Sequence, residues 1–295
     1  LKINTKLNKD RKNLNKNSKL IYLGNYDRYN ELNSSDIKWE LNKFDYIEYN
    51  LENKSMLRIY GNFIYDIDYD NKKIYLKRIQ KNSHAFFYGG SLKNWSIKFE
   101  DKTESIKDKK NDIFTGCLTF LDIIGDNLDI FSNNSKCEDS INFIRFSGKL
   151  KNLKVYNASS DAIDFDFSQS TIENVEIKNA ANDCLDFSYG KYSIKKLNVN
   201  SCGDKGVSIG ENSKFYSNIS NIEDVNVGVA SKDFSEAKFD KVNIKNVDVC
   251  LSSYNKKQEF SGGYIEVNNL YCENYNKKNI IDKNSIIKIN NKNYN

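Results

Sequence analysis

Hydrophobic and polar residues alternate in one short phrase of the chain, and this phrase recurs at a fixed distance. In residues 160–167, Asp164 and Asp166 separate three apolar side chains. Alternation with a period of two predicts a β-strand with one buried face. The second residues of the successive phrases are 161, 183, 205, 227 and 249, a constant step of 22. A fixed period of this size indicates a repeat architecture.

Further short apolar runs lie between these phrases, around residues 172–177, 194–199 and 239–247. Each repeat therefore holds two or three short strands and no segment of helix length. This pattern predicts an all-β fold, a right-handed parallel β-helix (solenoid) with 22-residue rungs. Equivalent residues of neighbouring rungs would lie about 4.8 Å apart. An ordinary β-sandwich would explain the strands but not their constant register.

The strand repeats favour one elongated domain for the 295 residues. An N-terminal cap is expected, because a solenoid would otherwise expose open strand edges. Within this cap, strands are expected at 56–60, 63–69 and 73–77. We divide the chain into a basic tail or linker at 1–20, the cap with irregular first rungs at 21–115, and regular rungs with a C-terminal cap at 116–295.

The distribution of charged and apolar residues bears on whether the protein binds nucleic acid or spans a membrane. The formal charge is +5, but residues 1–20 carry six Lys and one Arg against one Asp, so the remainder is near −1. We interpret the basic stretch as a solvated tail and predict no nucleic-acid partner. No apolar run is long enough to span a membrane. The chain begins at Leu1, so a preceding domain or leader is expected, and an extracellular or cell-surface location is favoured. The abundance of Asn, Lys and Ile is interpreted as a bias of the source genome.

Six cysteines are spread over the chain, at positions 117, 137, 184, 202, 250 and 272. Cys184 and Cys250 share a column but lie three rungs apart, roughly 14 Å, beyond disulfide reach. Cys250 and Cys272 lie on neighbouring rungs and could meet. We expect most of the thiols to be free and buried, where Cys packs as a small apolar residue. Without a Cys-x-x-Cys motif or a His partner, zinc is not predicted.

Polar residues form columns on the outward side of the repeated strand. The first column holds Asp139, Asp161, Asp183 and Lys205; the second Asn142, Asp164, Asp186 and Ser208; the third Asp166, Ser188, Gly210, Lys232 and Tyr254. A ladder of carboxylates inside an apolar coil would be very costly. We therefore assign the first column to a corner that turns outward.

Carboxylates stacked about 5 Å apart repel each other, so they raise one another's pKa or capture a cation. Two functional interpretations follow, a general acid/base cluster and an oxygen-rich Ca²⁺ site. The structural alternative is that Asp caps turns by accepting backbone N–H groups. Capping would account for Asp161 or Asp183 singly. It accounts less well for Asp164, Asp166 and Asp186, which lie in mid-strand, where Asp is disfavoured.

Four successive rungs carry a recognisable order of motifs. They read Ser-Ser-Asp-Ala-Ile-Asp at 159–164, Asn-Asp-Cys at 182–184, Asp-Lys-Gly-Val-Ser-Ile-Gly at 204–210 and Gly-Val-Ala-Ser-Lys at 228–232, followed by Tyr254. The order and spacing resemble the catalytic rungs of family 28 glycoside hydrolases, the polygalacturonases, in the pectin-lyase-like β-helix superfamily. The resemblance implies polysaccharide cleavage with Asp161 and Asp183 as hydrolytic carboxylates. It also implies substrate contacts from Lys232 and Tyr254.

The chain departs from that family at three positions. Asn182 replaces the first Asp of Asp-Asp-Cys, Lys205 replaces the His of Gly-His-Gly, and Ala230 replaces the Arg of Arg-Ile-Lys. Inverting hydrolysis needs one protonated carboxyl and a second that activates water. The Asp residues at 161, 164, 183 and 186 can still supply such a pair.

Two alternatives remain open. Polysaccharide lyases of this fold use a basic residue, often with Ca²⁺ on the uronate, and Lys205 would be that base. Adjacent carboxylates would raise the pKa of Lys205, which counts against this role. Arg145, in phase with Phe167, is a candidate carboxylate clamp. The other alternative is a non-catalytic saccharide-binding or structural surface module, which would show aromatic side chains along an open face; Tyr254 is the evident one.

The sequence thus predicts a β-helix that acts on, or binds, a polysaccharide or oligosaccharide. No cofactor is required for hydrolysis, and Ca²⁺ is the cation that the carboxylates would take. The candidate catalytic residues are Asp161, Asp164, Asp183, Asp186 and Lys205, and the candidate substrate-binding residues are Arg145, Asp166, Lys232 and Tyr254.

Overall fold

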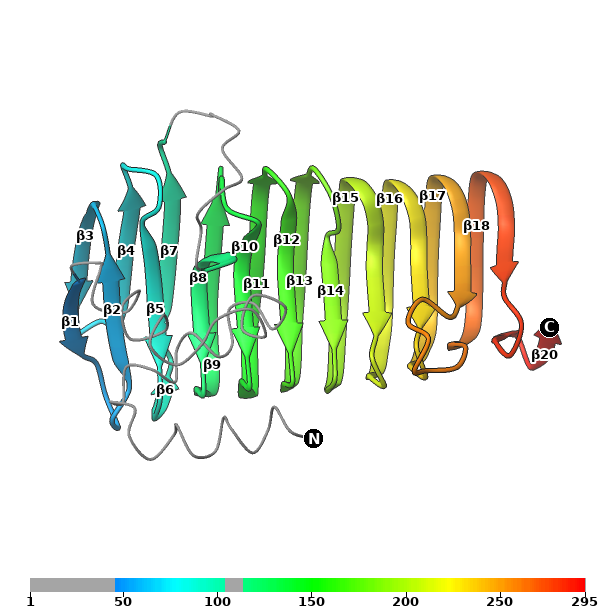
Figure 1. Ribbon diagram of the computed structural model, residues 1–295, viewed down its shortest axis with the longest axis horizontal. Coiled ribbons are helices and arrows are strands. Elements are labelled where there is room, and N and C mark those ends of the chain that lie inside the picture. The colour runs from blue at the N-terminus through cyan, green and yellow to red at the C-terminus, as the bar shows by residue number, and fades with distance from the viewer. Residues whose placement is uncertain (1–45, 104–113, 295) are drawn as a thin grey trace.

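The structure, a computed structural model, describes residues 46–103 and 114–294. Within these ranges every regular element is a β-strand, and the strands stack along one long axis in chain order (Figure 1). The predicted all-β solenoid is confirmed and the β-sandwich is wrong. The expected tail at 1–20 lies outside the described residues, as do 21–45 of the expected cap. The described part of the chain contains no helix long and apolar enough to cross a membrane.

The first strands do not yet follow the regular winding. They are β1 (Tyr46–Asn50), β2 (Met56–Tyr60), β3 (Phe63–Asp68), β4 (Lys73–Arg78), β5 (His84–Tyr88), β6 (Ser91–Lys93) and β7 (Ser96–Asp101). Strands β1, β2 and β5 pair antiparallel in that order, and β3 pairs antiparallel with β4. Parallel pairing begins where β4 meets β7 and β5 meets β8. The three strands expected in this part of the chain are confirmed as β2, β3 and β4.

The parallel rungs follow from β8 onwards and end where the last strand pairs antiparallel with the one before it. Their strands are β8 (Gly116–Leu121), β9 (Ile124–Asn133), β10 (Asp139–Ile144), β11 (Ser147–Ala158), β12 (Asp161–Asp166), β13 (Gln169–Ala180), β14 (Leu185–Ser188), β15 (Lys191–Gly210), β16 (Lys214–Lys232), β17 (Glu236–Tyr254), β18 (Tyr264–Ile281), β19 (Ile286–Ile289) and β20 (Lys292–Tyr294). We call front sheet the parallel array of β8, β10, β12, β14 and the ends of β15, β16 and β17. From β10 onwards its register steps by 22, with Ile163 beside Leu185 and Leu185 beside Val207.

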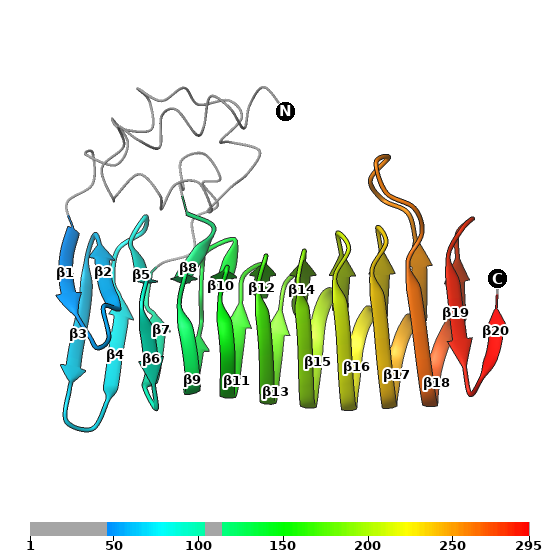
Figure 2. The same ribbon diagram turned by 90° about the horizontal axis from the view of Figure 1, so that it is seen from below.

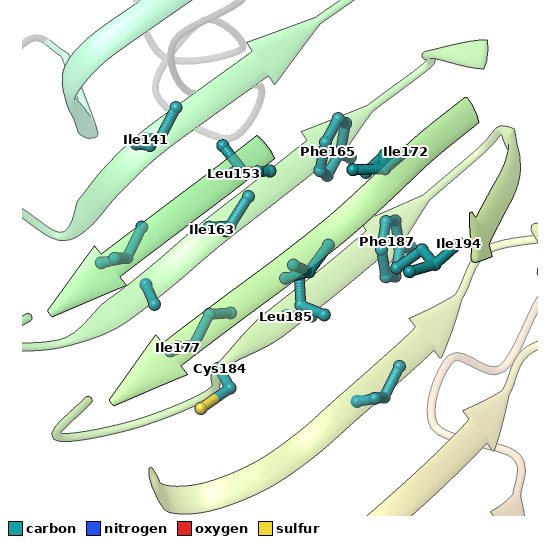
Figure 3. Close-up of a cluster of buried hydrophobic side chains, with 14 of the residues drawn as sticks. Ile141, Leu153, Ile163, Phe165, Ile172, Ile177, Cys184, Leu185, Phe187 and Ile194 are labelled. Carbon is teal, nitrogen blue, oxygen red and sulfur yellow. The ribbon is translucent and has the colours of Figure 1, made fainter. Parts of the chain in front are cut away.

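The front sheet turns its apolar side chains inward into one continuous core. Phe143, Phe165 and Phe187 stack there, with ring centroids 4.4 and 5.3 Å apart. Ile163, Leu185 and the facing residues of the other strands pack around this stack (Figure 3). Each ring is covered by its equivalent on the next rung, so the repeated Phe both fills the core and favours the register.

Asparagine supports the corners of the coil. Asn157 and Asn179 adopt left-handed backbone conformations, with φ of 57° and 60°, which Asn tolerates better than most residues. The Asn179 amide donates to Oδ1 of Asn157 at 3.0 Å, and Asn174 donates in the same way to Asn152. The abundance of Asn, interpreted above as genome bias, therefore has a structural use.

The cysteines are paired, so the expectation of free thiols is wrong. The disulfides join Cys117 to Cys137, Cys184 to Cys202 and Cys250 to Cys272, with Cα atoms 5.4, 5.7 and 6.5 Å apart, within the usual disulfide range. Cys184 and Cys250 are indeed too distant to pair. The sequence analysis compared only cysteines at equivalent positions of different rungs. It therefore missed the pairing of Cys184 with Cys202, which crosses a corner of the coil.

Candidate functional site

The outer surface of the front sheet carries the predicted columns. Asp139 pairs in register with Asp161, and Asn142 with Asp164. The second column continues through Asp186 to Ser208. Because alternate side chains of a strand point to opposite faces, the inward Phe stack leaves Asp164 and Asp186 on the outer side. Asp139 and Asp161 are the first residues of their strands, at the corner of the coil. We call this surface the acidic face.

Asp161 and Asp183 cap the rung that follows each of them. Oδ1 of Asp161 accepts the backbone N–H of Asp183 at 2.8 Å and the side-chain amide of Asn182 at 2.6 Å. Oδ1 of Asp183 accepts the N–H of Lys205 at 3.0 Å. The capping role considered from the sequence is therefore real for both residues. One oxygen of each carboxyl is therefore held by the fold.

Asp183 also lies beside a cation. Lys205 Nζ is 3.4 Å from Asp183 Oδ1 and forms a second ion pair with Asp204. Burial raises the pKa of Asp183 to about 6, although the charge of Lys205 opposes the shift. Burial lowers the pKa of Lys205, but its two carboxylate partners outweigh this effect, and the net change is upward. Lys205 is thus held as an ammonium group, which disfavours its role as a base.

Asp164 and Asp166 are adjacent on the same side of β12 and interact directly. Burial and the charges of neighbouring carboxylates raise the pKa of Asp164 well above its ordinary value. Burial and the charge of Asp186 raise the pKa of Asp166 to about 7, while a hydrogen bond from Asp164 lowers it. Asn142 Nδ2 lies 3.1 Å from Asp164 Oδ2. Burial and like charges therefore favour a proton on this pair of carboxyls.

Asp186 faces a buried cation of the opposite charge. Lys232 Nζ lies 3.8 Å from Asp186 Oδ1 and donates to Ser208 Oγ at 2.9 Å. The Lys232 side chain is 4% exposed and that of Asp186 29%. The pKa of Lys232 is raised, because the nearby acidic groups, led by Asp186, outweigh the opposing effect of burial. Tyr254 is the strand neighbour of Lys232, so the predicted contacts Lys232 and Tyr254 lie together beside the carboxylates.

Arg145 stands apart from this group. It lies just beyond β10, and its Nε donates to Asp122 Oδ1 at 2.6 Å, with a second contact from Nη2 to Oδ2. The guanidinium therefore already holds a carboxylate of the protein. Its role as a clamp for a substrate carboxylate stays a prediction.

Residues that sequence reasoning underrated lie at the edge of the acidic face. Glu211 accepts from Ser188 Oγ at 2.6 Å and pairs with Lys257 Nζ at 2.8 Å. Its carboxyl has a lowered pKa, because these partners outweigh burial. Phe167 and Tyr189, one rung apart, expose stacked rings beside it. The constant step of 22 from Arg145 through 167 and 189 to Glu211 was the signal that could have revealed this fourth column.

The acidic face does not present a fitting set of metal ligands. Among the described residues, no group of three or more His, Cys, Asp or Glu is placed to hold a metal ion. Asp161 and Asp183 each commit an oxygen to backbone N–H groups, and the raised pKa of Asp164 disfavours its ionised form. Ca²⁺ stays a prediction, and no step below passes through it.

A hollow of about 610 Å³ adjoins the corner where the front-sheet strands begin, on the C-terminal rungs. Asp224, Asn226, Asp248 and Asn276 are among its lining residues. It lies beyond Lys205 rather than over Asp164 and Asp186. The carboxyls with raised pKa values therefore belong to the sheet surface. We take this surface, rather than the hollow, as the candidate site, because perturbed pKa values cluster at functional sites.

Fold and site together define a parallel β-solenoid with an acidic face bordered by two buried or half-buried lysines. No family model, curated protein or solved structure matches the chain. The likeness to family 28 glycoside hydrolases thus rests on the rung motifs alone.

Proposed function

We propose that the protein cleaves glycosidic bonds of a polysaccharide on its acidic face. The observation that carries the proposal is the pairing of two neighbouring carboxyls in unlike surroundings, Asp164 among other carboxyls and Asp186 beside Lys232. Burial and like charges raise the pKa of Asp164, which favours its protonated form, whereas Asp186 lies 3.8 Å from the Lys232 ammonium. A protonated acid beside an ionised carboxylate is the pair that glycoside hydrolysis requires.

The register of the two strands sets the expected stereochemistry. Asp164 and Asp186 are direct neighbours in the front sheet, so their backbones lie about 4.8 Å apart. Retaining glycosidases place their two carboxyl groups about 5–5.5 Å apart, and inverting ones are wider to admit a water. The neighbouring positions favour retention over the inversion expected from the sequence.

The steps follow from these positions. Asp164 donates its proton to the glycosidic oxygen, and that bond breaks as an oxygen of Asp186 forms a bond to the anomeric carbon. A water then attacks the same carbon, its proton passes to the Asp164 carboxylate, and Asp186 is released. Lys232 lies beside Asp186, while Asp183 and Lys205 border the sugar that is displaced. An oxidising compartment outside the cytosol fits the three disulfides.

The test is a screen of acidic and neutral polysaccharides that measures both new reducing ends and the absorbance of unsaturated uronates. We expect reducing ends without unsaturation, at least a hundredfold loss in Asp164→Asn and Asp186→Asn, and unchanged activity in Asp126→Asn, an exposed carboxylate paired with Lys93. NMR of the first product anomer should show retention.

Three results would contradict the proposal in different ways. An unsaturated product would establish a lyase. An inverted anomer with activity dependent on Asp183 would move the water-activating role to that residue. Binding of glycans without cleavage would leave the alternative of a non-catalytic saccharide-binding module.

A further inference from the structure

Three aromatic residues of the solenoid adopt a backbone conformation that aromatic residues rarely adopt. Phe167, Tyr189 and Phe234 have φ of 50°, 51° and 62°. Of the 24 described non-glycine residues with positive φ, 13 are Asn and 3 are Asp, the types that tolerate this region. For a bulky residue the conformation costs on the order of 1 kcal/mol or more. Three aromatic residues in this energetically unfavourable backbone conformation call for a role that compensates its cost.

Core packing does not supply that role, because the three side chains point to the surface. They are 48%, 40% and 54% exposed. The rings nevertheless lie close together. Phe167 and Tyr189 stack, with ring centroids 4.8 Å apart and an interplanar angle of 4°. The ring centroid of Phe260 is 6.3 Å from that of Tyr189 and 6.0 Å from that of Phe234. We call Phe167, Tyr189, Phe234 and Phe260 the aromatic corner.

The backbone around the aromatic corner is held in place by hydrogen bonds. The N–H of Phe167 donates to Ser188 O at 2.9 Å, and that of Tyr189 to Glu211 O at 3.1 Å. Phe260 lies on the segment 255–263, which projects from the edge where the front-sheet strands end (Figure 2). The rings are therefore organised before any ligand arrives, which lowers the entropy lost on binding.

Asp233 anchors the start of that projecting segment. Its Oδ1 accepts the N–H groups of Lys256 and Lys257 at 2.7 and 2.9 Å. Lys257 then pairs with Glu211, and the Asn255 amide donates to Phe260 O at 2.7 Å. These contacts fasten the segment to the solenoid beside the acidic face.

The size of the aromatic corner identifies the kind of occupant. Three of the four aromatic side chains are about half exposed and Phe260 is less exposed, so together they offer roughly 300 Å². A stable protein partner or a second copy would need about 800 Å² on each side. The rings are also bordered by the polar groups of Ser188, Glu211 and Lys257, which match hydroxyl groups rather than an apolar protein surface. A pyranose ring has both properties, an apolar C–H face and a polar rim.

We propose that the aromatic corner is a sugar-binding subsite that holds the polysaccharide next to the carboxyl pair. Asp166 precedes Phe167 and Ser188 precedes Tyr189, so the corner continues the acidic face directly. A chain of sugars crossing Asp164 and Asp186 would place a neighbouring unit on the rings. The proposal rests on the proposed function only for the identity of the polymer, because binding can be measured without cleavage.

The test replaces Phe167 and Tyr189 together by Asn, the residue that this solenoid itself uses in left-handed corners. Calorimetric titration would use two probes, a hexamer of α-1,4-linked galacturonate and cellohexaose, on an Asp164→Asn background that prevents turnover. We expect the wild-type corner to bind one of them and the double Asn variant to bind at least tenfold more weakly. We also expect its melting temperature to be equal or higher, because Asn relieves the unfavourable φ. The matched control is Tyr271→Asn, which removes a 52% exposed aromatic ring elsewhere and should leave binding unchanged.

Each outcome decides between the two proposals. Equal binding by the double Asn variant, or no binding of either hexamer by the intact corner, overturns the subsite. Binding that depends on the corner in a protein that cleaves no glycan leaves the subsite standing and removes the hydrolase. Cleavage with an unchanged KM, when the same two Asn replacements are made in a protein that keeps Asp164, does the reverse.

Discussion

Replacing Asp183 with Asn should change how the stability of the fold depends on pH. The substitution removes one ionisable group and keeps an oxygen that can accept the N–H of Lys205, which Asp183 now accepts at 3.0 Å. The Asp183 side chain is only 8% exposed. Its pKa rises from 3.8 to about 6 on folding, chiefly because burial penalises the charge.

The sign follows from the direction of this shift. A carboxyl with a raised pKa in the folded state binds its proton more tightly there than in the unfolded chain, so its contribution to stability is present below pH 3.8 and lost as pH rises through 6. A shift of about two units corresponds to about 3 kcal/mol. Most of this lies between pH 4 and pH 8, so wild type should lose about 2–3 kcal/mol more than Asp183→Asn over that interval.

Urea unfolding of both proteins at pH 4, 6 and 8, followed by circular dichroism, measures the difference directly. The stability of Asp183→Asn relative to wild type should rise from pH 4 to pH 8. A difference that stays constant with pH would refute the claim that Asp183 is ionised at a cost in the fold. Glu176→Gln is the control of opposite sign, because Lys178 and Lys154 outweigh burial and lower the pKa of Glu176 to about 2; it should lose stability at neutral pH and less towards pH 2.

Three further changes test other parts of the structure. Phe165→Ala removes a ring from the core stack and should lower the free energy of unfolding by about 3–5 kcal/mol; a loss below about 1 kcal/mol in urea would show that the stack is not tightly packed. Asn174→Ala removes a ladder hydrogen bond to Asn152 and should cost about 1 kcal/mol, and an unchanged urea midpoint would contradict a stabilising ladder. The double change Cys250→Ser and Cys272→Ser opens a loop of about 22 residues and should cost about 3 kcal/mol; an unchanged melting temperature without reductant would mean that the bridge contributes nothing.

The repetitive part of the structure could be predicted because the same pattern of apolar and polar residues recurs on every rung. The inward Phe at 143, 165 and 187 and the outward acids at 164 and 186 recur with one step, and a slip by one residue would exchange buried and exposed sides. The front sheet and its columns follow from this pattern. The proximity of Lys232 and Tyr254 to Asp186 follows as well, because the second and third columns run side by side along the same sheet.

What the sequence did not reveal lies at the corners, where residues that are not equivalent meet. The bridge from Cys184 to Cys202 joins two different strands of the repeat, so comparing positions in phase could not find it. The exposure of Phe167 depends on a left-handed backbone, which ends the alternation that would place the ring inside. The protonation of Asp164 depends on burial and on the summed charge of its neighbours, neither of which is visible in the order of residues.

The segment between β17 and β18 shows where this architecture can change its length. From Glu236 to its partner Tyr264 the step is 28 residues instead of 22, yet the strands on either side keep their parallel register. The six additional residues are placed outside the coil, at a corner, and this segment carries Lys257 and Phe260. Insertions at corners can therefore remodel the ligand surface of a solenoid without altering its core, so that the specificity of such a protein can diverge while its rungs stay the same.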